Sequence, residues 1–150
     1  MKRIHVLRVS ADSKSSDFDA LTTAAKGRGL RVGRLDWRPE QAPEEAAPVP
    51  GGLDGTMLRH VRLEQGLATS WKPMAGAPVL GDVLREYFRG CSLVLVQSEG
   101  ALPEDAAIGS LERLEDDSYR VRVDGELAKQ LDLTADELAR RLPRPRPFDD

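Results

Sequence analysis

Residues 4–37, IHVLRVSADSKSSDFDALTTAAKGRGLRVGRLDW, decide the fold, because two apolar segments in them enclose an amphipathic one. Residues 4–9 are β-branched and apolar on both faces, which is typical of a strand in the middle of a sheet. Residues 30–37 predict a second strand. The chain therefore opens with a β-α-β unit.

The segment between these strands predicts a helix over residues 17–28. Ser16 is the expected N-cap, since its hydroxyl can accept a free amide of the first turn, and Asp19 stands three positions later as in a capping box. One helical face then carries the apolar side chains Phe18, Leu21 and Ala25. Glycines at 27 and 29 supply the stop.

Residues 38–55, RPEQAPEEAAPVPGGLDG, hold four prolines and four acidic residues, and they predict a flexible loop. Residues 56–64 and 67–72 predict a hairpin around Gln65 and Gly66. Residues 78–89 have the clearest helical periodicity, and Gly90 stands where such a helix would end. A buried strand is expected over residues 92–96.

The last third predicts a second hairpin, two helices and a tail. Residues 108–114 and 119–123 are its expected strands, and the second alternates between apolar and Arg side chains. Two short helices are expected after Gly125, the second with Thr134 as N-cap. Residues 143–150, rich in Pro and Arg, predict an extended, mobile tail.

These elements predict an α+β protein with a single domain over residues 1–142. If one strand of the first hairpin is set aside, residues 3–98 have the order β-α-β-β-α-β. This is the order of the ferredoxin-like fold, with both helices on one face of an antiparallel sheet. A mixed sheet with another strand order is equally compatible with the elements.

The charge is balanced over the chain but uneven along it. The 150 residues carry 22 Lys and Arg against 25 Asp and Glu, a net charge of −3. Residues 1–38 contribute +5, residues 39–98 contribute −2 and residues 99–150 contribute −6. A predicted pI of about 5.5 argues against a dedicated duplex-binding protein. Arg outnumbers Lys by 17 to five, which is typical of GC-rich bacterial genomes.

The sequence offers few residues for catalysis. The single cysteine, Cys91, follows a predicted helix, where the helix dipole disfavours a thiolate, so we expect it to be a small packed side chain. His5 and His60 stand inside predicted strands without ligand spacing. We therefore predict no catalytic residues, no metal and no cofactor, and a cytoplasmic location.

Two stretches are candidate binding sites. The first precedes the first helix, where hydroxyls, an ammonium and free amides could hold a phosphate; its residues are Ser13, Lys14, Ser15 and Ser16. The second is a basic cluster beside an aromatic residue, which could bind single-stranded nucleic acid; its residues are Lys26, Arg28, Arg31, Arg34 and Trp37.

We expect a small binding or regulatory protein, such as an adaptor, inhibitor or immunity-type protein, that acts through a protein–protein surface. Whether it is an enzyme stays open, with the scarcity of reactive side chains against it. The alternatives are a small enzyme that handles a phosphate-bearing substrate through residues 10–19, and a nucleic-acid-binding protein that uses residues 26–38. No apolar run is long enough to span a membrane, and a hairpin edge could pair two copies into a homodimer.

Overall fold

The structure describes residues 4–39, 59–74, 76–98, 102, 109–123 and 129–149, which contain both helices and strands. The elements are β1 (His5–Val9), η1 (Ser15–Phe18, a 3-10 turn), α1 (Asp19–Gly27), β2 (Val32–Trp37), β3 (His60–Glu64), β4 (Leu67–Trp71), α2 (Leu80–Tyr87), β5 (Leu93–Ser98), β6 (Gly109–Arg113), β7 (Ser118–Val123), β8 (Lys129–Thr134) and α3 (Ala135–Arg141). They form two compact units: Met1–Arg38 with Val79–Asp150, and Pro39–Pro78. The α+β class is confirmed. Whether the chain is one domain stays a prediction.

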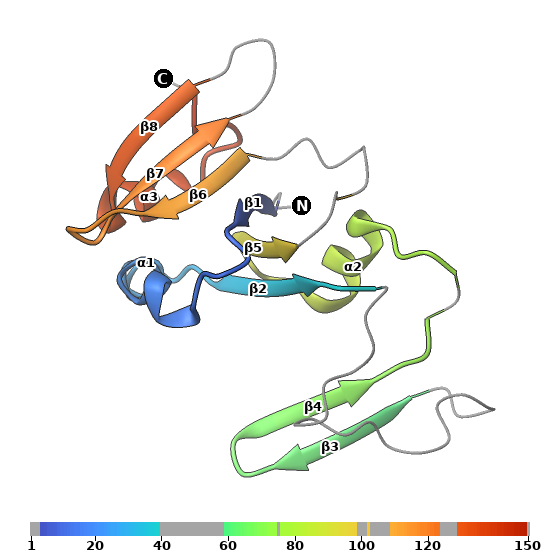
Figure 1. Cartoon of the computed structure of the whole chain (residues 1–150). Coiled ribbons are helices and arrows are strands. Elements are labelled where there is room, and N and C mark those ends of the chain that lie inside the picture. The colour runs from blue at the N-terminus through green and yellow to red at the C-terminus, as the bar shows by residue number, and fades with distance from the viewer. Residues whose placement is uncertain are drawn as a thin grey trace. The chain divides into compact units, whose positions relative to one another are not determined.

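The larger unit contains a six-stranded mixed sheet in the order β2-β5-β1-β6-β7-β8 (Figure 1). Its first four strands are parallel, and β7 and β8 complete the sheet as antiparallel neighbours. Four consecutive residues of β5, Leu93 to Val96, are buried. A strand in the middle of a covered parallel sheet buries both faces, which explains why this run is continuously apolar.

Helices cover the two faces of this sheet. On one face, α1 and α3 pack together over a cluster that includes Leu21, Leu95 and Leu138. On the other face, Leu84 and Phe88 from α2 and its C-cap pack against a cluster that includes Val94. The predicted apolar face of the first helix is confirmed, since its three side chains, Phe18, Leu21 and Ala25, are all buried. No helix of the described residues has the length and hydropathy needed to cross a membrane.

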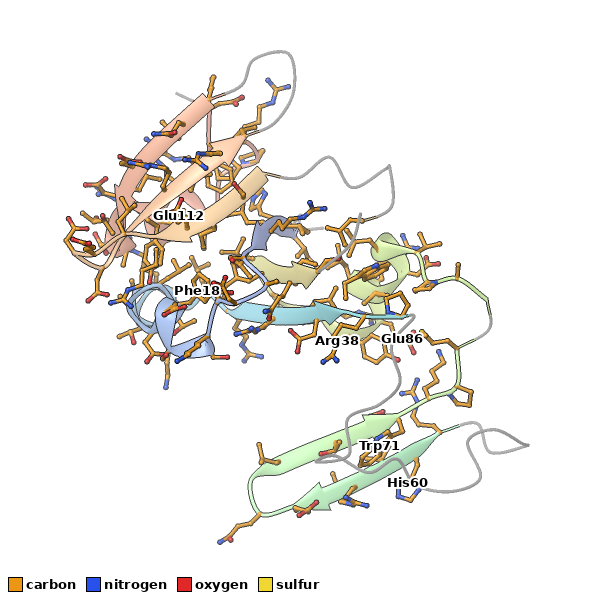
Figure 2. The ribbon with its side chains drawn as sticks, in the orientation of Figure 1. Phe18, Arg38, His60, Trp71, Glu86 and Glu112 are labelled. Carbon is orange, nitrogen blue, oxygen red and sulfur yellow. The ribbon has the colours of Figure 1, made fainter. Side chains whose placement is uncertain are left out.

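The smaller unit contains the predicted hairpin of β3 and β4, which turns at Gly66 with φ of +75°. Trp71 lies edge-on to His60 at 5.5 Å between ring centroids, as Figure 2 shows, and the Arg62 guanidinium lies 5.0 Å from the Trp71 ring. Val61 and Leu63 are exposed on the opposite face of the hairpin. Residues 40–55 of the predicted flexible loop lie outside the described residues.

The prediction of a ferredoxin-like fold is wrong. That fold needs an antiparallel sheet with the hairpin strands inside it, whereas here β1, β2, β5 and β6 are parallel and β3 pairs only with β4 among the described strands. The helices also cover both faces of the sheet. The mixed sheet, which the elements equally allowed, is the one observed.

The prediction of the first of the two C-terminal helices is also wrong, because those residues form β8. Leu131 and Leu133 alternate with polar residues at the period of two that a strand requires, and Arg120 of β7 forms an ion pair with Asp132 at 2.9 Å. The second helix is α3, and its predicted cap is confirmed, since Thr134 Oγ1 accepts a hydrogen bond from the Glu137 amide at 3.1 Å.

The segment expected to be an extended tail instead turns back on the larger unit over residues 143–149. Phe148 packs against the α1–α3 core cluster, and Arg141 donates to the Pro147 carbonyl at 3.3 Å. The His5 ring lies 3.0 Å from the Arg144 carbonyl. Packing of the partly buried Phe148 ring against this cluster opposes the extended conformation that the prolines of the segment favour.

Gly109 and Gly81 provide a test of the packing beside β6. A Cβ at Gly109 would lie 2.3 Å from the Arg122 carbonyl oxygen, whereas one at Gly81 would meet nothing within 4 Å. We expect Gly109→Ala to lower the free energy of unfolding by about 1–3 kcal/mol, as overpacking does. Gly81→Ala should raise it by up to about 1 kcal/mol, because alanine favours the helix. Urea unfolding of both variants measures this, and equal stabilities would contradict the close approach of β6 and β7.

Candidate functional site

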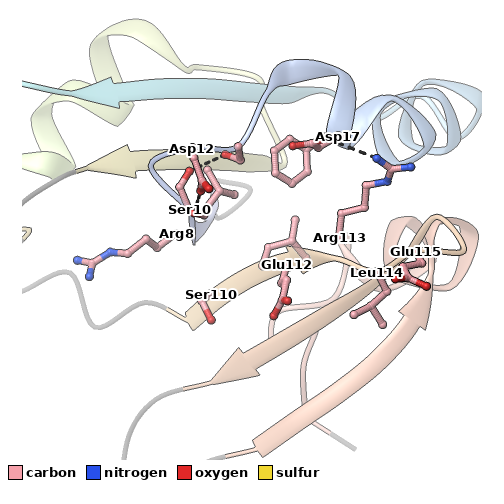
Figure 3. Close-up of a pocket in the computed structure, with 13 residues that line it drawn as sticks. Arg8, Ser10, Asp12, Asp17, Ser110, Glu112, Arg113, Leu114 and Glu115 are labelled. Carbon is pink, nitrogen blue, oxygen red and sulfur yellow. Dashed lines mark hydrogen bonds and ion pairs between the residues drawn. The ribbon is translucent and has the colours of Figure 1, made fainter.

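A groove of about 840 Å³ opens where β1 ends beside β6 (Figure 3). It is lined by Arg8, Val9, Ser10, Asp12, Ser13, Asp17, Phe18, Ser110, Leu111, Glu112, Arg113, Leu114 and Glu115. The groove therefore lies at the carboxyl end of a parallel strand, which is where open α/β sheets bind their ligands.

The groove exists because β1 pairs unequally with its two neighbours. It pairs with β5 along all five residues, from His5 to Val9, but with β6 only through Leu7 and Arg8. β6 continues to Arg113, and its ladder with β7 follows it there. Among the described strands, none pairs with the second half of β6 on its β1 side, and the groove occupies that place.

Main-chain groups of β6 point into the groove. The Leu114 amide donates to the Ser118 carbonyl at 2.8 Å, which fixes the phase of the β6–β7 ladder. Because hydrogen-bonded and non-bonded pairs alternate in an antiparallel ladder, Glu112 bonds to β7, and Leu111 and Arg113 turn their polar groups the other way. The Leu111 amide continues the parallel ladder with β1. The Leu111 carbonyl and both main-chain groups of Arg113 therefore face the groove.

Arg34 of β2 holds the loop that forms the opposite wall. Its guanidinium donates to Ser15 Oγ at 2.9 Å and to the Ser13 carbonyl at 3.2 Å, and it also bonds to the Gln97 amide oxygen. The Gln97 side-chain nitrogen in turn donates to the Ala11 carbonyl. Two side chains from β2 and β5 thereby fix the loop's main chain at two points, away from the β6 edge.

Asp17 closes the loop at the start of η1. Its carboxylate accepts the Lys14 amide at 2.8 Å, and Lys14 is the N-cap of η1. The prediction of Ser16 as the helix N-cap is therefore wrong. The Arg113 guanidinium lies 3.5 Å from Asp17 on the other side, across the groove. The buried Tyr119 hydroxyl donates to the Asp17 carbonyl at 3.1 Å and accepts the Leu21 amide at 3.3 Å.

Charged side chains stand at both ends of the groove. Where β1 stops, the Ser10 hydroxyl donates to the Asp12 carboxylate and lowers its pKa below the usual value, which keeps it ionised. The Arg8 side chain leads away from this place (Figure 3). Farther along β6, Arg113 is bound by Asp17 and Asp117, and the hydrogen bond that it donates to Asp117 is the largest cause of its raised pKa.

Of the four predicted phosphate-binding residues, Ser13 lines the groove and the other three follow it along the chain, with several of their polar groups in internal hydrogen bonds. Ser13 donates its amide to the Ser10 carbonyl at 3.0 Å and its hydroxyl to the same oxygen at 2.6 Å. Ser15 Oγ accepts from Arg34, and the Lys14 amide is capped by Asp17. Ser16 lies in η1 and is exposed.

The predicted nucleic-acid residues are dispersed over several local environments. Arg28 forms an ion pair with Asp136 of α3 at 3.0 Å, and Arg34 faces the loop. Trp37 packs against the α2-side core cluster. Lys26 and Arg31 are exposed. Both site predictions stay predictions.

Cys91 packs against the α2-side cluster, and burial raises its thiol pKa, as expected of a packed cysteine. Among the described residues, no three or more His, Cys, Asp and Glu side chains gather as metal ligands would.

Comparisons with protein-family models, with curated proteins and with solved structures find no match to this chain.

Sequence reasoning placed residues 10–16 at a strand's end but missed the β6 side of the groove. The missing residues are Ser110 to Glu115, which the sequence places in a hairpin far along the chain. Predicting that β1 pairs with β6 over so short a length would have required knowing the strand order. The only local sign of this wall in the sequence is that the charged residues Glu112 and Arg113 follow a buried part of the strand.

Arg34→Met tests the loop attachment, since it keeps the apolar stem and removes every guanidinium hydrogen bond. We expect the free energy of unfolding to fall by about 1–3 kcal/mol, and hydrogen exchange of the amides of residues 11–17 to accelerate. Arg31→Met is the matched control, because Arg31 is exposed and stands immediately before β2. Equal exchange in both variants would show that Arg34 does not fix the loop.

Proposed function

We propose that this protein binds other proteins, and that it takes an extended segment of its partner beside the second half of β6. The observation that carries the proposal is the exposed strand edge: the Leu111 carbonyl and the Arg113 amide and carbonyl face a groove and not a neighbouring strand. Such an edge is a ready template for pairing with another chain.

Strand addition suits the shape of this groove. Main-chain hydrogen bonds give such complexes affinity, and pockets for alternate side chains give them specificity. Val9, Phe18 and Leu111 supply apolar groove lining, and each belongs to the core cluster that α1 and α3 cover. The site therefore combines polar main-chain groups on one side with a fixed apolar surface, and the Arg34 attachment keeps the opposite wall in place before a partner arrives.

This role is the one expected of an adaptor, an inhibitor or an immunity-type protein, which work by occupying a partner and need no reactive group. Its cytoplasmic location, bacterial origin and assembly as a homodimer stay predictions. The alternative of a phosphate-bearing substrate receives less support, because amides and hydroxyls of residues 13–15 serve the loop itself. The nucleic-acid alternative likewise needs Arg28 and Arg34, which bind within the fold.

Two substitutions at one position test whether the main chain of β6 binds the partner. Arg113→Ala removes the guanidinium but keeps the N–H, whereas Arg113→Pro removes the N–H that faces the groove. We expect decapeptides selected from a randomised pool to bind the Ala variant within about threefold of the parent and to lose at least about tenfold on the Pro variant. Calorimetric titration measures this, with circular dichroism to confirm folding.

Failure to select any binding peptide would overturn the proposal, as would selected peptides that bind the folded Pro variant as well as the parent. If the Pro variant does not fold, NMR titration of the parent replaces it. The Arg113 amide resonance should then shift on peptide addition, and an unmoved resonance at saturation would contradict strand addition. A thermal shift with phosphate esters and none with peptides would favour the alternative enzyme function.

A further inference from the structure

The groove beside the second half of β6 is closed at one end by β1. β1 still pairs with β6 at Arg8 and Ser110, and the chain leaves the sheet immediately afterwards, at Ser10. A segment that pairs with Leu111 and Arg113 occupies the line that β1 has left. It therefore meets the end of β1 head-on and cannot continue past it in the plane of the sheet.

A chain that cannot continue is best accommodated if it ends there. The length of β6 from Leu111 to Leu114 matches about three or four residues of an extended strand at roughly 3.3 Å per residue. The free edge thus has room for a short extended segment, and β1 limits that segment at one end. Whether the amino or the carboxyl terminus of a partner fits there depends on the charges at the closed end of the groove.

The charges at the closed end favour a cation. Asp12 is held there by the Ser10 hydroxyl and is ionised, and the Arg8 side chain leads away from it (Figure 3). The cation at the opposite end, Arg113, is already bound by two carboxylates. Glu112 and Glu115 also line the groove, but farther along β6 than the closed end. An α-ammonium group would be attracted to the closed end, and an α-carboxylate would be repelled from it.

The direction in which a partner chain would run along β6 also favours an amino terminus at the closed end. A chain whose amino terminus lies at the closed end runs outward along β6 in the direction of β6 itself. It is then parallel to β6, as β1 is, so it continues the parallel ladder that β1 abandons. Its first residues would meet the Leu111 carbonyl and the Arg113 amide in the order in which β1 would have met them.

We propose that the groove binds the free amino-terminal end of a partner polypeptide, with the α-ammonium group at Asp12 and the first residues paired in parallel with β6. This inference rests on the proposed function and specifies its ligand. Asp12 supplies the charge, Ser10 orients Asp12, and β1 itself provides the stop that selects a chain end over an internal segment.

The test compares three forms of each peptide selected from the randomised decapeptide pool: with a free amino terminus, with an N-acetyl group, and with four glycines added before its first residue. The free form should bind at least about tenfold more tightly than the other two, because acetylation removes the α-ammonium charge and the extension moves the selected side chains four residues away from the amino terminus. Asp12→Asn should bring the free form to within about threefold of the acetylated one.

Asp116→Asn is the matched control. Asp116 also accepts a hydrogen bond from a serine two residues away, Ser118, and its pKa is likewise lowered by it, but it does not line the groove. This variant should keep the full preference for the free amino terminus. Equal loss of the preference in both variants would show that general charge, and not Asp12 at the closed end, attracts the peptide.

The outcomes separate the two proposals. Peptides that bind beside β6 equally well in all three forms would overturn the amino-terminal site and leave the proposed function standing. A preference for the free amino terminus that Asp12→Asn does not reduce would also overturn it. Absence of any selected peptide would overturn the proposed function itself, and the inference with it.

Discussion

The unequal pairing of β1 creates the groove in which we propose that a partner binds. β1 is fully paired with β5 but leaves β6 after Arg8, because Val9 is its last apolar residue and the following Ser10, Ala11 and Asp12 have no strand pattern. β6 continues since β7 pairs with it on the other side. Arg34 and Gln97 then hold the departing chain, so the space beside β6 stays open and its main-chain groups stay accessible.

Most elements of this fold could be predicted from local patterns, and the errors arose where a distant partner decides the structure. Continuous apolar runs gave β1 and β5, and helical periodicity gave α1 and α2. β8 was missed because Leu131 and Leu133 are its only inward apolar residues, too few to distinguish a strand from a short helix without β7 beside it. The sheet order was missed for the same reason, since no local pattern shows that β5 lies between β1 and β2.

The loop wall of the groove could be predicted from the sequence, whereas the β6 wall could not. A polar segment between a central strand and a helix indicates the carboxyl end of a sheet, and of residues 13–16 it is Ser13 that lines the groove. What those residues do there depends on Arg34, Gln97 and Arg113, which come from β2, β5 and β6. The sequence assigned Arg34 to an external ligand because an arginine's charge is visible in a sequence and its internal hydrogen-bond acceptors are not.

Amide hydrogen exchange of the protein without ligand tests the central claim most directly. Glu112 and Arg113 are adjacent in β6, but the alternation of the ladder gives the Glu112 amide to β7 and turns the Arg113 amide toward the groove. The account predicts strong protection of the Glu112 amide and exchange of the Arg113 amide at least about a hundredfold faster, because only the first opens with the sheet. Equal protection of the two amides would contradict an open β6 edge.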